Sequence, residues 1–83
     1  MYQVDLSRAA QKNLRKIDKR FQEKILSSLI SLKTNPFIGE KMIGKFQDSY
    51  RIKIPPIRII YVIAFKSKKI NVRNIGHRGD IYK

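Results

Sequence analysis

The chain has 83 residues, 42% of them hydrophobic, and a formal net charge of +13, so we expect one basic domain over residues 1–83. It contains no cysteine, which excludes disulfides, cysteine-ligated zinc and a thiol nucleophile. No apolar run is long enough to span a membrane, and the N-terminal residues lack the charged and then apolar arrangement of a signal peptide. We therefore expect a cytoplasmic protein without membrane contact.

The first part of the sequence predicts a short strand followed by two helices. Residues 2–6 alternate as a strand does, and Ser7 is a residue type that caps helices. The helix after it has apolar residues at helical spacing, at Ala10, Leu14 and Ile17. Asp18 marks a break or a second cap, and the next helix has an apolar stripe made by Phe21, Ile25, Leu29 and Leu32. Asn35-Pro36 ends that helix, because a residue before proline avoids the helical region.

From residue 50 onward the period changes from helix to strand. Residues 50–54 alternate, and Pro55-Pro56 forms the connection to the next strand. Residues 57–65 are almost continuously apolar, which predicts a central strand buried on both faces. Residues 70–75 form the last strand, and a loop follows. The order β-α-α-β-β-β predicts an α+β fold, in which a helical hairpin packs on a four-stranded sheet.

Four basic residues of this second part are expected to converge. Period-two geometry places Arg51 and Lys53 on one face of their strand, and the hairpin through the prolines brings Arg58 close to them. Arg78 lies just past the last strand. Few acidic residues are near them in the sequence, so we expect little internal neutralisation. Such a patch suits a phosphate, but pattern alone fits a plain solvated sheet face equally well.

Two further residues of the last segment bear on function. Tyr82 is an aromatic next to cations, suited to stacking on a base or to capping the edge of the core. His77 is the single histidine, suited to acid–base chemistry. It is equally suited to holding the loop after the last strand, and this structural role is the one we favour.

The net charge predicts a polyanionic partner, because so large an excess repels itself in the folded state. Nucleic acid is the first expectation, an acidic protein the second and an anionic membrane surface the third. A basic stripe on the first helix is most simply a solvated face, and it would also hold a polyanion backbone without specificity. Its members are Lys12, Arg15, Lys16 and Lys19.

Taken in order, these pieces resemble the RelE/ParE toxin superfamily over nearly the whole chain. The resemblance is carried by the helical hairpin ending at Asn35-Pro36 and by four later stretches, YRIKI at 50–54, RIIY at 58–61, IGHR at 75–78 and DIY at 80–82. It implies two N-terminal helices packed on a twisted, mostly antiparallel sheet. It also implies an endoribonuclease that cuts mRNA in the ribosomal A site, beside rRNA, with no metal or cofactor. Its expected partner is an antitoxin whose covering segment is acidic.

The resemblance also implies site residues. The functional cations of the superfamily match Arg51, Lys53, Arg58 and Arg78, and its stacking tyrosine matches Tyr82. We expect RNA contacts from Arg51, Lys53, Arg58, Arg73, His77, Lys12 and Lys16. In RelE the position of Arg51 is often lysine, and a guanidinium hardly ever gives up its proton, so we assign the base role to Lys53. Some relatives use histidine or glutamate as acid or base, but the sequence predicts no glutamate near this site.

The implied reaction is attack of the ribose 2′-OH on the adjacent phosphate. Lys53 takes the proton, Arg58 and Arg51 hold the phosphate, Arg78 stands at the leaving oxygen, and Tyr82 stacks on the nucleotide. Two alternatives remain, a ParE-like inhibitor of DNA gyrase with no enzymatic activity, and an inactive nucleic-acid-binding member. The presence of the expected cations and of the tyrosine favours the nuclease.

Overall fold

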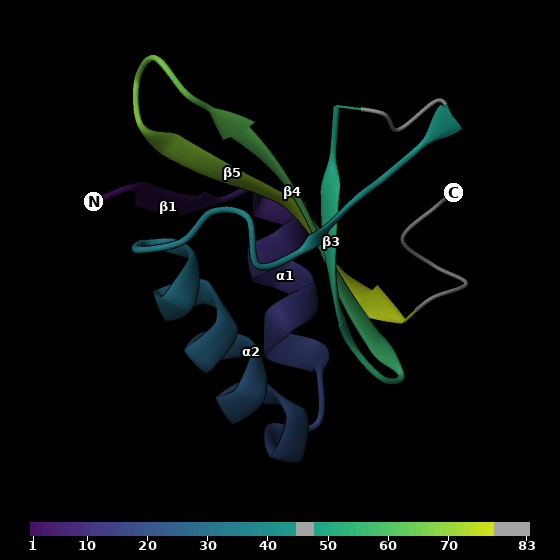
Figure 1. Ribbon diagram of the computed structural model, residues 1–83. Helices are drawn as coiled ribbons and strands as arrows, with labels where there is room; N and C mark the ends of the chain where they lie inside the picture. Colours follow the sequence, from purple (N-terminus) through teal and green to yellow (C-terminus); the bar gives the residue numbers. More distant parts are fainter. Residues whose placement is uncertain (45–47, 78–83) are drawn as a thin grey trace.

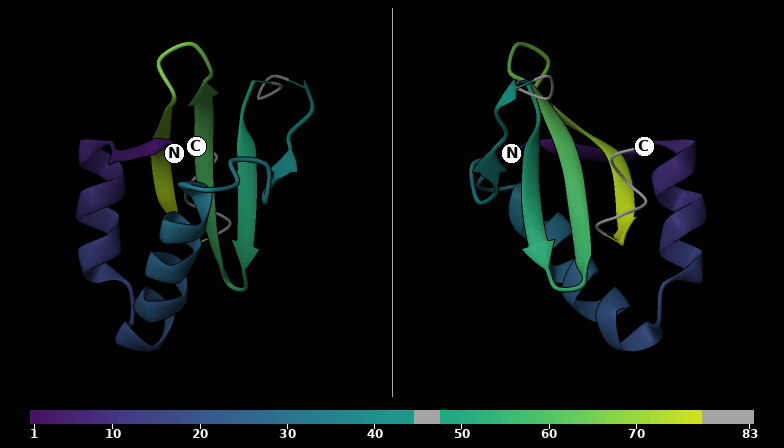
Figure 2. Two further views of the ribbon diagram at one scale, coloured as in Figure 1. Left: turned by 60° about the vertical axis from the view of Figure 1, so that its left-hand side comes forward. Right: turned by 90° about the vertical axis from the view of Figure 1, so that its right-hand side faces the viewer.

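The computed structural model describes residues 1–44 and 48–77 and has two helices packed on one side of a five-stranded sheet (Figures 1 and 2). The elements are β1 (Gln3–Leu6), α1 (Arg8–Lys16), α2 (Lys19–Leu32), β2 (Glu40–Lys41), β3 (Tyr50–Ile54), β4 (Ile57–Ala64) and β5 (Lys69–His77). No helix in these two ranges is both long and apolar enough to cross a membrane.

The sheet has the strand order β1-β5-β4-β3-β2, with β1 parallel to β5 and every other pair antiparallel. The predicted α+β class is therefore confirmed, and β4 is the central strand, as expected. The strand count was wrong, because β2 adds a fifth strand. This strand has only two residues, both exposed, so it has no periodicity that a sequence pattern reveals. It exists because its backbone pairs with β3.

Both predicted helix caps are present. The Ser7 hydroxyl accepts a hydrogen bond from the backbone N–H of Ala10 at 3.0 Å, and Asp18 Oδ1 accepts one from Arg20 at 3.0 Å. Each bond satisfies one of the backbone donors that a helix start leaves without a partner. Ser7 also donates to the carbonyl of Arg73 at 2.7 Å, which fastens the start of α1 to the middle of β5.

One face of the sheet packs against the helices and forms the core. The residues of β4 that point to it are Ile57, Ile59, Tyr61 and Ile63, all buried. We call the other side of the sheet the open face. It carries the alternate residues of β4, which are Arg58, Ile60, Val62 and Ala64. The expectation that this strand is buried on both faces is met only in part, because Ile60 of the open face is buried whereas Arg58, Val62 and Ala64 are half-buried. The period-two geometry of β4 thus separates the core from a surface that the helices do not cover.

Tyr61 holds the segment between α2 and β2 against the sheet. Its hydroxyl donates to the carbonyl of Pro36 at 2.8 Å and accepts from the N–H of Gly39 at 3.0 Å. A Cβ on Gly39 would lie 2.6 Å from that hydroxyl and 2.7 Å from the carbonyl oxygen of Arg51. Only glycine allows this close approach, which brings Glu40 into register with Arg51.

Candidate nucleic-acid interface

Three of the predicted cations lie together on the open face. Lys53 of β3 is paired with Arg58 of β4, so their side chains lie side by side across the strands. Arg51 is two residues from Lys53 on the same strand and points to the same face. We call Arg51, Lys53 and Arg58 the cationic cluster. Two of the three positive charges come from one strand, and the β3–β4 hairpin adds the third.

A glutamate lies at this cluster, which the sequence did not predict. Glu40 is paired with Arg51 in register, and its Oε2 is 3.4 Å from Arg51 Nη2 and 3.6 Å from Lys53 Nζ. The expectation of little neutralisation, with no glutamate near the site, is therefore wrong. The reason is that β2 brings Glu40 across from a distant part of the chain. Its two residues, Glu40 and Lys41, are too few to show a strand period.

The two ion pairs are exposed to solvent. The side chains of Glu40, Lys53 and Arg51 are 60%, 41% and 30% exposed. Pairs this open add little to the free energy of unfolding, because water competes for both partners. They matter chemically instead, since they place an acidic oxygen among groups that would bind a phosphate.

His77 lies on the other side of the sheet from the cationic cluster. It pairs with Ile57, a core residue, whereas its neighbour Gly76 pairs with Arg58. His77 lines a small pocket of about 180 Å³ with Asn13, Lys16, Ile17 and Gly76. The structure therefore places His77 beside Lys16 of α1 and separates it from the cluster. Lys12, the other RNA-binding candidate on α1, is exposed.

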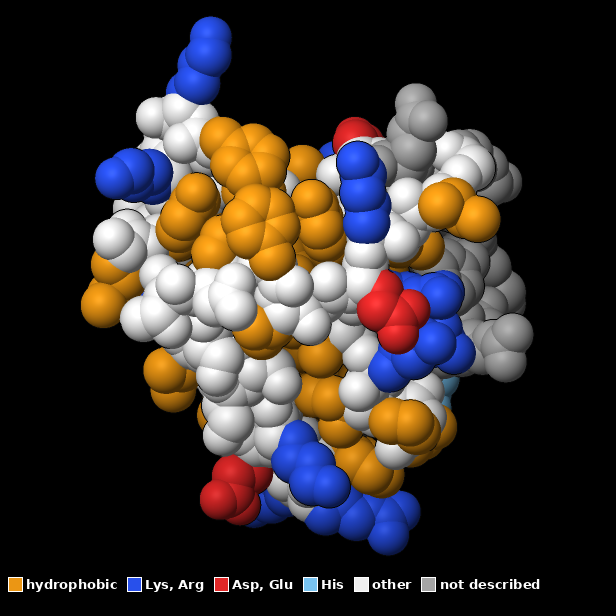
Figure 3. Space-filling model, viewed as in Figure 1, with side chains coloured by type: hydrophobic (Ala, Val, Ile, Leu, Met, Phe, Trp, Pro, Cys, Tyr) orange, Lys and Arg blue, Asp and Glu red, His pale blue; other side chains and the backbone are white. Residues whose placement is uncertain are grey.

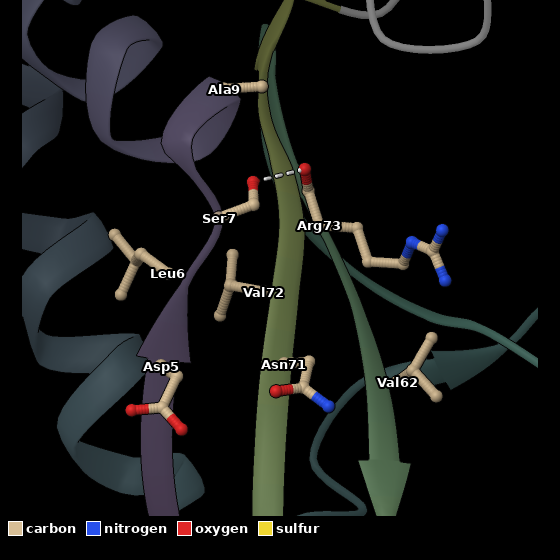
Figure 4. A pocket seen from close by; sticks show the side chains of 8 residues that line it. All are labelled: Asp5, Leu6, Ser7, Ala9, Val62, Asn71, Val72 and Arg73. Carbon is tan, nitrogen blue, oxygen red and sulfur yellow. Dashed lines mark hydrogen bonds between the residues drawn. The ribbon is translucent and has the colours of Figure 1, made fainter.

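Arg73 also lies apart from the cluster. The pairing between β4 and β5 shifts between Ile60 and Tyr61, and Arg73 is the extra residue of this bulge. It lines a shallow pocket of about 540 Å³ over β1, β5 and β4, where its neighbours include Asp5, Val62 and Asn71 (Figure 4). Arg73 thus belongs to a second polar region of the molecule.

The remaining predicted positions, Arg78 and Tyr82, lie outside the described residues. Within residues 1–44 and 48–77, no three metal-ligating side chains form a group. The described catalytic candidates are therefore the cationic cluster, to which the structure adds Glu40.

A second surface feature is a set of aromatic rings that we call the aromatic patch, made by Phe37, Tyr50 and Phe65. The rings of Phe37 and Phe65 stack with centroids 5.8 Å apart, and Phe37 meets Tyr50 edge-on at 6.1 Å. Phe37 and Phe65 are 55% and 54% exposed. Figure 3 shows that hydrophobic side chains gather on one face of the molecule and that lysine and arginine side chains lie on either side of them.

Comparison with known proteins identifies the family. Residues 4–82 match the model of the ParE toxins of type II toxin–antitoxin systems, parDE. The chain is a toxin of the RelE/ParE superfamily. RelE1 of Methanocaldococcus jannaschii is 29% identical to this toxin over 86 residues, covering 99% of this chain and 96% of that one.

Solved structures share the fold of this toxin. The Mycobacterium tuberculosis toxin–antitoxin complex RelBE2 contains a chain with a TM-score of 0.83 and 18% identity, covering 93% of this chain and 98% of that one. The isolated Escherichia coli RelE toxin has a TM-score of 0.80 and 23% identity, covering 99% and 92%. The predicted resemblance to the superfamily is confirmed, and so is its fold.

Proposed function

We propose that this toxin is a ribosome-dependent endoribonuclease that cuts mRNA in the ribosomal A site without a metal or cofactor. The observation that carries the proposal is the pairing of Lys53 with Arg58 on one face of a hairpin, with Arg51 beside them. Cations on adjoining strands have fixed spacing, so they can stabilise the charge that develops on a phosphate without reorganising. A nuclease acting on ribosomes would work in the cytoplasm, as the sequence predicts.

The reaction is an in-line displacement at phosphorus. The ribose 2′-oxygen forms a bond to the adjacent phosphorus and loses its proton to a base, while the bond from phosphorus to the 5′-oxygen breaks and that oxygen gains a proton. The products are a 2′,3′-cyclic phosphate and a 5′-hydroxyl. Arg58 and Arg51 hold the phosphate and stabilise the pentavalent state. The ribosome contributes by orienting the message.

Glu40 changes the assignment of the base. An ammonium group has no lone pair to accept a proton, whereas an ionised carboxylate is only an acceptor. Lys53 Nζ lies 3.6 Å from Glu40 Oε2, so a carboxylate acceptor stands beside the lysine at this site. We therefore propose that Glu40 accepts the proton of the 2′-OH and that Lys53 contacts the phosphate.

The other predicted residues keep the roles that the resemblance implies. Arg78 stands at the leaving oxygen, and Tyr82 stacks on the nucleotide. Lys12 and Lys16 of α1 bind the phosphate backbone of mRNA or rRNA by charge alone. His77 contacts RNA from the α1 side, where it shares a pocket with Lys16.

The proposed protein partner is an antitoxin with an acidic covering segment. The relatives from M. tuberculosis, E. coli and Pyrococcus horikoshii are solved as toxin–antitoxin complexes. On this toxin the cationic cluster would attract the acidic segment, and the aromatic patch offers exposed rings for apolar side chains of the same partner. Lys66 and Lys68 lie one and three positions after Phe65, so an acidic partner is favoured at the patch as well.

Primer extension on a defined message in a translating extract tests the nuclease. Wild-type toxin should produce new 5′ ends inside codons, and Arg58→Ala should lower cleavage by about 10²-fold. Lys24→Ala, which removes an exposed charge from α2, should cut like the wild type. Equal cleavage by wild type and Arg58→Ala would overturn the proposal.

The second candidate is inhibition of DNA gyrase, and the match to the ParE family model favours it. In that case, expression would arrest growth with DNA-damage signalling while messages stay intact. An inactive RNA-binding toxin would instead bind RNA with a strong salt dependence and would not arrest growth.

A further inference from the structure

The pocket that contains Arg73 lies on the same open face as the cationic cluster. Val62 follows Arg58 along β4 at a distance of roughly 13 Å, four residues at about 3.3 Å each. Val62 is paired with Asn71 of β5, and Asn71 is paired with Asp5 of β1. Asp5, Asn71 and Val62 therefore form a row across three strands, which Figure 4 shows from close by. An RNA strand held at Arg58 would reach this row within a few nucleotides.

Hydrogen bonds hold the walls of this pocket. The Gln3 side-chain amide donates to Asp5 Oδ1 at 2.9 Å, which orients the carboxylate. Ser7 donates to the carbonyl of Arg73 at 2.7 Å, which fixes the backbone of the bulge (Figure 4). The pocket is thus built on three strands and a helix start rather than on a free loop.

The mixture of groups in the pocket suits a base better than a phosphate. Asp5 repels a phosphate, yet it is one of only 6 acidic residues in a chain with 19 lysines and arginines. A carboxylate accepts hydrogen bonds and donates none. The base that offers two adjacent donors on its Watson–Crick edge is guanine, through N1–H and the 2-amino group. Adenine, cytosine and uracil place an acceptor next to their donor on that edge.

Arg73 and the other two residues of the row complete such a site. Asn71 and Arg73 carry N–H donors, and guanine has acceptors at O6 and N7. Val62 offers an apolar contact for the ring. Single-stranded RNA exposes these edges, because its bases can be unstacked and turned outward.

We propose that the pocket formed by Asp5, Val62, Asn71 and Arg73 binds a guanine base of the message and determines where this toxin cuts. The proposal rests on the proposed RNA cleavage, since it treats the same open face as the path of the RNA. It makes Asp5 and Asn71 specificity-determining residues that act at a distance from the reacting phosphate.

Binding of mononucleotides tests the pocket without any cleavage. Isothermal titration with guanosine 5′-monophosphate and adenosine 5′-monophosphate should show roughly tenfold tighter binding of the guanine nucleotide. Asp5→Asn should remove this preference by weakening the guanine nucleotide and strengthening the adenine nucleotide, because the variant loses a repulsive charge. Glu23→Gln removes the same charge from exposed α2 and should keep the preference. Equal affinities in the wild type, or an unchanged preference in Asp5→Asn, would overturn the proposal.

Mapping of cut sites separates this proposal from the proposed function. On a message with all codons represented, wild-type cuts should lie next to guanine, and Asp5→Asn and Asn71→Ala should spread them over other bases. Thermal unfolding shows whether the variants are folded. If the wild type prefers the guanine nucleotide but never cuts, the proposed nuclease activity is refuted, whereas guanine binding in the pocket is supported. A wild type that cuts without regard to guanine, with Asp5→Asn cutting identically, refutes the pocket.

Discussion

Lys53 and Arg58 lie directly opposite each other on β3 and β4, so two like charges share one face of a hairpin. Like charges in this position repel and lower the free energy of unfolding. The same two charges would attract an anion such as a phosphate. The pair should therefore lower the free energy of unfolding and raise the affinity for RNA, and both effects can be measured.

Removing one charge of this pair should stabilise the protein and weaken RNA binding. We expect Arg58→Gln to raise the free energy of unfolding by about 0.5 kcal/mol at low salt, with a smaller gain at high salt because ions screen the repulsion. Urea unfolding and filter binding to a short RNA measure the two effects. Lys24→Gln, on exposed α2, should change neither by as much. A loss of stability in Arg58→Gln would contradict this account.

Glu40→Gln should separate binding from catalysis. The amide keeps the shape of Glu40 but removes the proton acceptor and the negative charge beside Arg51 and Lys53. We expect RNA affinity to rise a few-fold and the cleavage rate at saturation to fall by about 10²-fold. Single-turnover cleavage on programmed ribosomes measures both values. If Glu40→Gln cleaves normally while Lys53→Met is inactive, the base is Lys53.

Gly39→Ala should destabilise the fold far more than Gly44→Ala. A Cβ on Gly39 meets the Tyr61 hydroxyl and the Arg51 carbonyl, whereas one on Gly44 meets nothing within 4 Å. Gly44 has a positive φ of 75°, so alanine there costs only about 1 kcal/mol of backbone strain. We expect a loss of about 2–3 kcal/mol for Gly39→Ala in denaturant unfolding. Similar losses in the two variants would show that the close approach is unimportant.

Tyr61 should give the protein a stability that falls at alkaline pH. Burial raises the pKa of its hydroxyl above the ordinary tyrosine value of 10.0, so the folded state holds the proton more tightly than the unfolded state. This contribution is complete below the unfolded pKa and is lost as the pH rises from there through the folded pKa. Tyr61→Phe should lack this alkaline loss and should be about 1–3 kcal/mol less stable at neutral pH, because Pro36 and Gly39 lose their partner. Urea unfolding between pH 7 and 11 checks it, with Tyr2→Phe as the control.

Phe65→Ser should weaken the antitoxin complex without changing cleavage. Phe65 is exposed, stacks on Phe37 and lies outside the cationic cluster. We expect a loss of about tenfold or more in affinity for the proposed antitoxin, measured by titration of the purified pair. Leu26→Ser removes a similarly exposed apolar side chain from α2 and should bind normally. Equal losses in the two variants would place the partner elsewhere.

The alternation of residues along β3 could be predicted from sequence because it is a local property. Arg51, Lys53 and Arg58 share a face for that reason, and Ser7 and Asp18 cap helices by bonds to residues two or three positions away. Each of these interactions is decided within a few residues of the chain or across one tight hairpin. The prediction therefore needed no knowledge of distant segments.

Which side chains lie next to these residues was decided only by the tertiary structure. Glu40 reaches the cluster through a two-residue strand that has no period, and the Cβ-free Gly39 allows that approach. The pairing of β5 with β4 puts Gly76 rather than His77 beside Arg58, and the bulge at Arg73 carries that arginine to the row of Asp5 and Asn71. Strand register depends on backbone pairing between segments far apart in sequence, and a shift of one residue exchanges the faces. The amino-acid pattern thus determined which side chains alternate, and the packed sheet decided which of them meet.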